Sequence, residues 1–132
     1  MKLVLDTRTL LWTIGESGKL SETVIKEIKN PDNDVFVSAV SLWEIALKYS
    51  IGKLLIDFDV KKIPDYCAKM RFRLIPLDPI DALNSLQLPI KKDHKDPFNR
   101  MLIYQCITGK YILVSKDDKN KKYREEGLKV IW

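Results

Sequence analysis

Three short runs of apolar residues constrain the fold of this chain more than any other feature. They read KLVL (Lys2–Leu5), VFVS (Val35–Ser38) and YILVS (Tyr111–Ser115), and none of them alternates between apolar and polar residues. A continuous apolar run of this length is typical of a strand that is buried on both faces, as in a parallel sheet covered by helices. Two weaker runs, at Arg73–Leu77 and Lys129–Trp132, bring the expected strands to five.

The segments between these runs carry the features of helices. Apolar residues recur at helical spacing, and Ser or Asp stands at the expected N-caps. Pro lies in the first turn of some expected helices, and Gly follows the last residue of others. We expect helices at Ser21–Lys29, Ser41–Ser50, Val60–Phe72, Pro79–Leu88 and Pro97–Thr108, a short helix after Asp117, and helix-like residues after Asp6. Strands that alternate with helices predict an α/β fold with a mostly parallel sheet.

Length and composition limit the classes of protein that fit. The chain has 132 residues, 45% of them hydrophobic, which suits a single domain over residues 1–132 with one sizeable core. No apolar run is long enough for a membrane span, and the first residues lack the apolar stretch of a signal peptide. Cys67 and Cys106 form no C-x-x-C pair, so we expect reduced cysteines and a cytoplasmic protein without membrane association. The net charge of +5 is compatible with a nucleic-acid partner.

Four acidic residues are expected at one edge of the sheet. Asp6 ends the first strand, Asp117 follows the fourth, Glu44 lies on the helix after the second, and Asp96 opens the last long helix. Ligands of open parallel sheets bind beyond the carboxyl ends of the strands, where these acids would meet. Carboxylates that meet repel one another unless a cation lies between them, and oxygen ligands favour Mg²⁺ or Mn²⁺. Such an ion could activate water for attack on a phosphodiester, which predicts a nuclease.

Each acid also has a purely structural interpretation. Asp6 and Asp96 stand where a helix N-cap is expected, and Asp117 could be an exposed turn residue. Glu44 follows Ser41 by three residues, as in a capping box. His94, the only histidine, lies in a Lys-rich loop and is expected to be structural or solvated. The residues alone therefore leave both interpretations open.

Four sequence blocks resemble those of PIN-domain ribonucleases of the VapC toxin type. LVLDTRTLLW is similar to the L-L-D-T-H-A-L-L-W pattern of one branch, and SAVSLWEIALK to its S-x-x-S-x-W-E-I-A-x-K pattern. HKDPFNRMLIYQC is similar to H-K-D-P-F-D-R-x-L-I-A-Q-A. SKDDKNKKY with the closing VIW is similar to T-x-D, F-x-x-Y and I-W. The blocks occur in order and span nearly the whole chain.

This resemblance implies a three-layer α/β/α sandwich with a central, mostly parallel five-stranded sheet. It implies an endoribonuclease dependent on Mg²⁺ or Mn²⁺, the toxin of a type II toxin–antitoxin pair, with RNA as substrate, a cognate antitoxin as partner and a homodimer as the expected assembly. The family's acids correspond to Asp6, Glu44 and Asp117, and Asp96 matches the Asp of D-P. We expect these four residues to be catalytic and, together with Asn99, to form the metal site. The basic residues expected to bind the substrate are Arg8, Arg100 and Lys116.

Asn99 is the main departure from the pattern, because the family has the Asp of F-D-R at this position. An amide oxygen can bind Mg²⁺ but brings no charge. Arg8 replaces the His after D-T and could point toward the acids or away from them. Two hypotheses follow: the acids still hold an ion and the protein cleaves RNA, or it is a weakened or inactive relative that binds an antitoxin or RNA.

A third class is a phosphoryl-transfer enzyme with Asp6 as an aspartyl nucleophile. Haloacid-dehalogenase-like enzymes have D-x-D-x-[TV] at the end of the first strand. This chain has D-T-R-T, with Arg8 in place of the second Asp. The sequence therefore disfavours this class.

Overall fold

The computed structural model describes residues 1–132 and contains one five-stranded sheet. All strand pairs are parallel, and the order across the sheet is β3-β2-β1-β4-β5. The strands are β1 (Lys2–Leu5), β2 (Asp34–Ser38), β3 (Arg73–Ile75), β4 (Ile112–Val114) and β5 (Lys129–Ile131). The expected strands are confirmed, with ends that differ by one or two residues.

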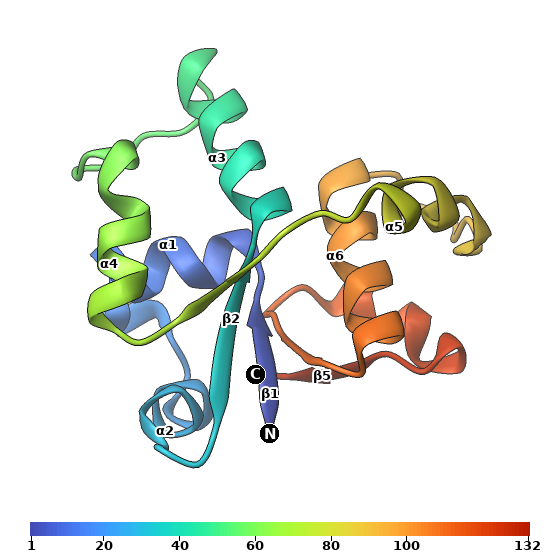
Figure 1. The fold of residues 1–132 in the computed structure, drawn as a ribbon, viewed down its shortest axis with the longest axis horizontal. Coiled ribbons are helices and arrows are strands. Elements are labelled where there is room, and N and C mark those ends of the chain that lie inside the picture. Colours follow the sequence, from blue (N-terminus) through green and yellow to red (C-terminus); the bar gives the residue numbers. More distant parts are fainter.

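Helices connect the strands and cover both faces of the sheet (Figure 1). The α-helices are α1 (Thr7–Gly15), α2 (Glu22–Lys29), α3 (Ala39–Ser50), α4 (Ile63–Lys69), α5 (Pro79–Asn84) and α6 (Pro97–Gly109). Shorter 3-10 helices are η1 (Ser17–Lys19), η2 (Val60–Lys62), η3 (Ser85–Gln87) and η4 (Asp118–Glu126). The predicted α/β/α architecture with a parallel central sheet is thus confirmed.

Two hydrophobic cores lie on the two faces of the sheet. On β1 the side chains of Leu3 and Leu5 belong to one core and that of Val4 to the other, as the alternation of a strand requires. The first core includes Leu10 of α1 and further residues of α2, α3 and α4. The second is built mainly from α6, with Tyr123 of η4 fully buried in it. Burial on both sides explains why the strands read as continuous apolar runs.

Local sequence features explain how several helices begin and end. Ser21 caps α2 by accepting a hydrogen bond from the Val24 N–H at 3.1 Å. Asp78 caps α5, where Pro79 takes the first position. The helix expected to end at Phe72 stops at Lys69 instead, and Gly52 beyond α3 has a φ of 75°, which favours glycine.

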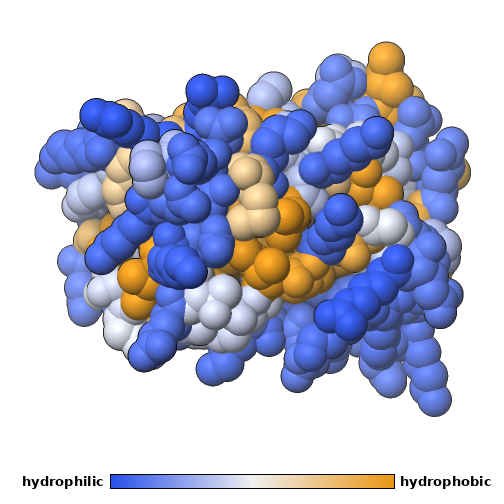
Figure 2. All heavy atoms as spheres, turned by 90° about the horizontal axis from the view of Figure 1, so that it is seen from below, coloured by the Kyte–Doolittle hydropathy of each residue, from blue (hydrophilic) through white to orange (hydrophobic).

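Exposed apolar side chains occur on several elements, among them α3 and the segment formed by α5 and η3. Figure 2 views the molecule from below and shows hydrophobic atoms in a central band between hydrophilic side chains. No helix combines the length and the apolar character that crossing a membrane would require.

Candidate active site

A cleft of about 440 Å³ lies at the carboxyl ends of the strands. It is lined by seven of the eight residues that the sequence predicted for the site: Asp6, Arg8, Glu44, Asp96, Asn99, Lys116 and Asp117. Arg100 is the one that does not line it. Residues far apart in the sequence meet here because parallel strands all end at the same edge of the sheet.

Asp6 lies where β1 passes into α1. Its N–H donates to the carbonyl of Val114 at 3.1 Å, which extends the pairing of β1 with β4, and its Oδ1 accepts from the N–H of Thr9 at 2.8 Å. Burial raises the pKa of Asp6, while hydrogen bonds from Ser115 and Thr9 lower it in part. Asp6 is therefore both a helix cap and a carboxyl whose negative charge is poorly compensated by the protein.

Glu44 faces the cleft from α3 and is not part of a capping box. α3 begins at Ala39, and its N-cap is Ser38, whose Oγ accepts from the Val40 N–H at 3.1 Å. The expected start at Ser41 is wrong because Ser38 satisfies the first N–H groups three residues earlier. Glu44 is only 7% exposed.

The carboxylate of Glu44 has two partners within the cleft. Thr7 Oγ1 donates to its Oε1, and the Lys48 ammonium forms an ion pair with its Oε2. Thr7 and Lys48 both line the cleft, and neither was predicted as a site residue. Lys48 could have been found from its spacing, because it lies four residues after Glu44 on the same helix.

Asp96 and Asp117 cap helices and line the cleft at the same time. Asp96 Oδ1 accepts from the N–H of Phe98 at 3.0 Å and of Asn99 at 3.4 Å. Asp117 Oδ1 accepts from the N–H of Lys119 at 2.9 Å. In each carboxylate the cap uses Oδ1 and no bond within the chain uses Oδ2. Capping and ligation are thus compatible for these two acids.

Asn99 is held from two sides by its amide nitrogen. Nδ2 lies 2.8 Å from His94 Nε2 and donates to Asn120 Oδ1 at 2.8 Å. His94 is 3% exposed, and its Nδ1 lies 2.6 Å from the hydroxyl of Tyr123. Burial lowers the pKa of His94. The structural role expected for His94 agrees with these contacts.

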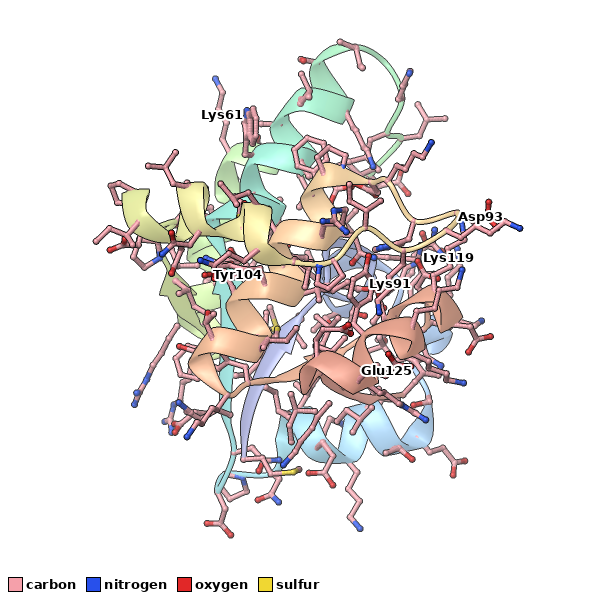
Figure 3. All side chains as sticks on the ribbon, turned by 90° about the vertical axis from the view of Figure 1, so that its right-hand side faces the viewer. Lys61, Lys91, Asp93, Tyr104, Lys119 and Glu125 are labelled. Atoms are coloured by element: carbon pink, nitrogen blue, oxygen red, sulfur yellow. The ribbon has the colours of Figure 1, made fainter.

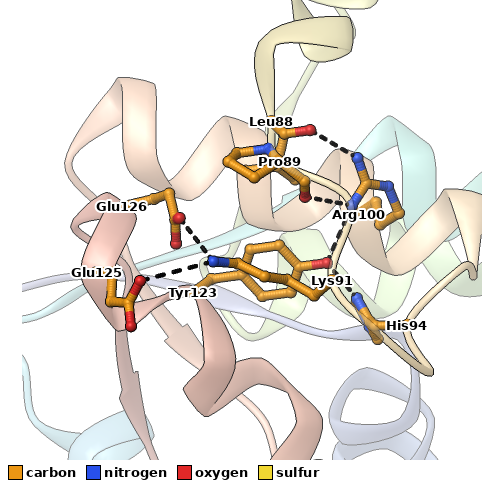
Figure 4. A network of polar contacts seen from close by, with 8 residues as sticks. All are labelled: Leu88, Pro89, Lys91, His94, Arg100, Tyr123, Glu125 and Glu126. Carbon is orange, nitrogen blue, oxygen red and sulfur yellow. Dashed lines mark hydrogen bonds and ion pairs between the residues drawn. The ribbon is translucent and has the colours of Figure 1, made fainter.

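Arg100 points away from the cleft into a polar network (Figure 4). Its guanidinium donates to the carbonyls of Pro89 and Leu88 at 2.9 and 3.0 Å, and to the hydroxyl of Tyr123 at 3.0 Å. These bonds hold the loop before α6 against α6 and η4. We therefore assign Arg100 a structural role in place of the substrate contact expected from the sequence.

Lys91 holds the same loop from its other side. Its ammonium lies 2.7 Å from Glu126 and 3.9 Å from Glu125, and it stands over the ring of Tyr123. Asp93 lies at the outer tip of the loop, with a φ of 62° (Figure 3). Lys91 and His94 thus hold in place the loop that carries Asp96 into the site.

The residues of the cleft fit a hard divalent cation by their chemistry. Carboxylates and one amide supply oxygen donors, and burial of Asp6 without a bonded cation leaves charge for a metal to compensate. No three His, Cys, Asp or Glu side chains converge closely enough to hold an ion by themselves. A bound ion would therefore also need Asn99 or water among its ligands.

Comparison with known proteins assigns the family. The sequence matches the profile described as PIN domain over residues 3–126. The chain belongs to the PIN domain family. No curated protein matches it significantly.

Several solved structures share the fold of this PIN domain. VapBC2 from Rickettsia felis, bound to a DNA fragment from its promoter, aligns with a TM-score of 0.66 and 16% identity over 99% of this chain and 98% of that one. DNA-bound VapBC from Salmonella typhimurium aligns at 0.64 with 18% identity over 99% and 97%. VapBC-1 from nontypeable Haemophilus influenzae aligns at 0.66 with 12% identity over 99% and 97%. The resemblance inferred from the four sequence blocks is confirmed.

Proposed function

We propose that this PIN domain is a metal-dependent endoribonuclease, the toxin of a toxin–antitoxin pair that acts in the cytoplasm. The observation that carries the proposal is the gathering of Asp6, Glu44, Asp96 and Asp117 along one cleft, beside Asn99. The likeness to structures of VapBC complexes supports the toxin assignment. RNA as substrate comes from the family resemblance.

The oxygen-bearing side chains of the cleft would have different roles in phosphodiester cleavage. Asp6 and Asp117, at the ends of adjacent strands, would hold Mg²⁺ or Mn²⁺ together with Glu44 or Asn99. Such an ion, when bound, lowers the pKa of water and stabilises charge on a phosphoryl group. Thr7 and Lys48 orient the Glu44 carboxylate.

Two exposed cations flank the acids. Arg8 and Lys116 line the cleft and are free of salt bridges to acids of the chain, so both can reach the phosphates of a bound strand. Placing cations beside an acidic centre lets a polyanion approach carboxylates that would otherwise repel it.

The surface offers apolar area for protein partners. Large side chains of α3 are exposed at Trp43 and Tyr49, and the α5–η3 segment exposes Ile80, Leu83 and Leu86 by 66%, 73% and 81%. Apolar side chains this exposed commonly mark interaction surfaces. They support a complex with an antitoxin and a homodimer as parts of the proposal.

The test is cleavage of an unstructured RNA by the purified chain with Mn²⁺ or Mg²⁺. Cleavage should stop with EDTA, and Asp6→Asn should abolish it. Asp117→Asn should reduce it about a hundredfold or more, whereas Asp118→Asn, which alters an exposed neighbour paired with Lys121, should leave it intact. Metal-independent cleavage, or full activity of Asp6→Asn, would refute the proposal.

The second candidate is a PIN domain that binds its partners without cleaving RNA. Asn99 brings no charge to the site, and no three acids converge in the cleft. This candidate predicts tight antitoxin binding and no cleavage with either metal. Any cleavage that EDTA stops and Asp6→Asn removes would exclude it.

A further inference from the structure

Asn120 connects two candidate metal ligands from behind the cleft. It lies in η4, is fully buried, and does not line the cleft itself. Its Nδ2 donates to the hydroxyl oxygen of Ser115 at 2.8 Å, and its Oδ1 accepts from Nδ2 of Asn99 at 2.8 Å. The same Ser115 oxygen accepts from the N–H of Asp117 at 3.1 Å. A chain of hydrogen bonds therefore runs from the backbone of Asp117 through Ser115 and Asn120 to Asn99.

The direction of these bonds follows from the backbone of Asp117. Its N–H can only donate, so the Ser115 oxygen accepts it, and the same oxygen accepts a second bond from Nδ2 of Asn120. With Nδ2 of Asn120 turned to Ser115, its Oδ1 faces Asn99.

Asn99 is left with a single orientation. Its Nδ2 must face the oxygen of Asn120, and its second amide hydrogen goes to Nε2 of His94, 2.8 Å away. Both hydrogens are then used, and Oδ1 has no partner within the chain. Because Asn99 lines the cleft, this oxygen is the atom it can offer to a bound ligand.

We propose that Asn120 is a positioning residue that turns the carbonyl oxygen of Asn99 into the cleft as a neutral ligand for a divalent cation. The inference rests on the proposed function, because it concerns the same metal site. It explains how a chain with an amide in place of an acid keeps an oxygen at this position.

The same geometry disfavours an aspartate at position 99. In Asn99→Asp an oxygen would replace Nδ2, and it would face Oδ1 of Asn120 and the unprotonated Nε2 of His94. Asn120 itself stands at the first position of NKKY, where the F-x-x-Y pattern of the similar branch has Phe. The two side chains that bond to each other thus both depart from the patterns that the chain otherwise follows.

The tautomer of His94 tests the orientation without any substitution. If Asn99 donates to Nε2, the neutral ring must carry its hydrogen on Nδ1 and donate it to Tyr123. His94 is the only histidine, so long-range ¹H–¹⁵N correlation spectra at about pH 8, above the usual imidazole pKa, contain one pair of ring nitrogens. The expected result is the Nδ1–H tautomer. The Nε2–H tautomer would overturn the proposal, because Asn99 would then turn its oxygen to His94.

Binding of Mn²⁺, measured by calorimetry or electron paramagnetic resonance, tests the ligand role. Asn120→Leu frees the amide of Asn99 to rotate and should weaken Mn²⁺ about tenfold or more, the usual cost of losing an outer-shell partner. Asn84→Leu, at a residue of α5 outside the cleft with no side-chain hydrogen bond, should bind as the unaltered chain does.

The outcomes separate this proposal from the proposed function. If the unaltered chain does not bind Mn²⁺, the metal-dependent function fails and the ligand role of Asn99 fails with it. If the unaltered chain binds Mn²⁺ and a folded Asn120→Leu binds it equally well, only the positioning role is overturned. Should Asn120→Leu fail to fold, the tautomer of His94 in the unaltered chain still decides the orientation.

Discussion

Removing one oxygen atom from Tyr123 should destabilise the fold by a predictable amount. Tyr123 is fully buried, and its hydroxyl is the common partner of His94 Nδ1 at 2.6 Å and Arg100 Nη1 at 3.0 Å. Tyr123→Phe keeps the ring in the core but leaves the buried Nδ1 of His94 without its hydrogen-bond partner. Arg100 is partly solvated and keeps two carbonyl partners, so losing its bond to the hydroxyl costs less free energy than the change at His94.

The expected cost is that of one buried polar group left without a partner, about 2 kcal/mol. For a chain of this length, about 3–5 °C of melting temperature correspond to each kcal/mol, so the midpoint should fall by roughly 6–10 °C. The assay is thermal unfolding by circular dichroism, together with urea unfolding to obtain the free energy. The m-value should stay unchanged, because the surface exposed on unfolding is nearly the same.

Tyr104→Phe is the matched control. Tyr104 is also buried, but no hydrogen bond of its hydroxyl to another residue is present, so the same chemical change should cost less than about 0.5 kcal/mol. Equal stabilities of Tyr123→Phe and the unaltered chain would refute the reasoning, since they would mean that the hydroxyl contributes nothing to the network in Figure 4.

Three further predictions concern the same half of the molecule. Arg100→Lys should lower the free energy of unfolding by about 1–2 kcal/mol in urea titrations, because an ammonium cannot reproduce the fork of three bonds; reduced RNA affinity at unchanged stability would restore the substrate role instead. The pKa of His94 is lower in the folded chain than its ordinary value near 6.5, so the unfolded chain binds the proton more readily and stability should fall as the pH drops through about 6.5. Urea midpoints measured across this range should show the fall, and His94→Gln should flatten it. Gly109→Ala should destabilise by about 1–3 kcal/mol in thermal unfolding, because the new Cβ would lie 2.2 Å from the ring of Tyr111; an unchanged midpoint would show that the ring moves aside freely.

The sequence predicted the features that depend on local composition. Buried parallel strands need apolar residues on both faces, so continuous runs such as Lys2–Leu5 identified the strands. Acids placed just after those runs had to meet at one edge, which brought Asp6 and Asp117 into the predicted site. Asn99 was singled out because it replaces an acid in an otherwise matching pattern.

Other features could not be read from neighbouring residues. Ser41 and Ser38 are both plausible caps, and only the end of β2 decides that α3 starts at Ala39. Arg100 follows Asn99 directly in the chain, but consecutive residues of a helix point in directions about 100° apart. Its side chain therefore reaches the loop carbonyls and lies outside the cleft. A motif fixes which residues are adjacent in sequence but not which way each of them points.

The sequence by itself determined that this is a parallel α/β chain with acids at the ends of its strands. Continuous apolar runs indicate strands buried on both faces, and their alternation with helical segments indicates a parallel sheet. Only the tertiary structure decided what Asn99 does. Its partners, His94 and Asn120, reach it from a loop and from a segment 21 residues away, and hydrogen-bond direction depends on where those atoms meet in space. The role of that amide is therefore a property of the folded chain.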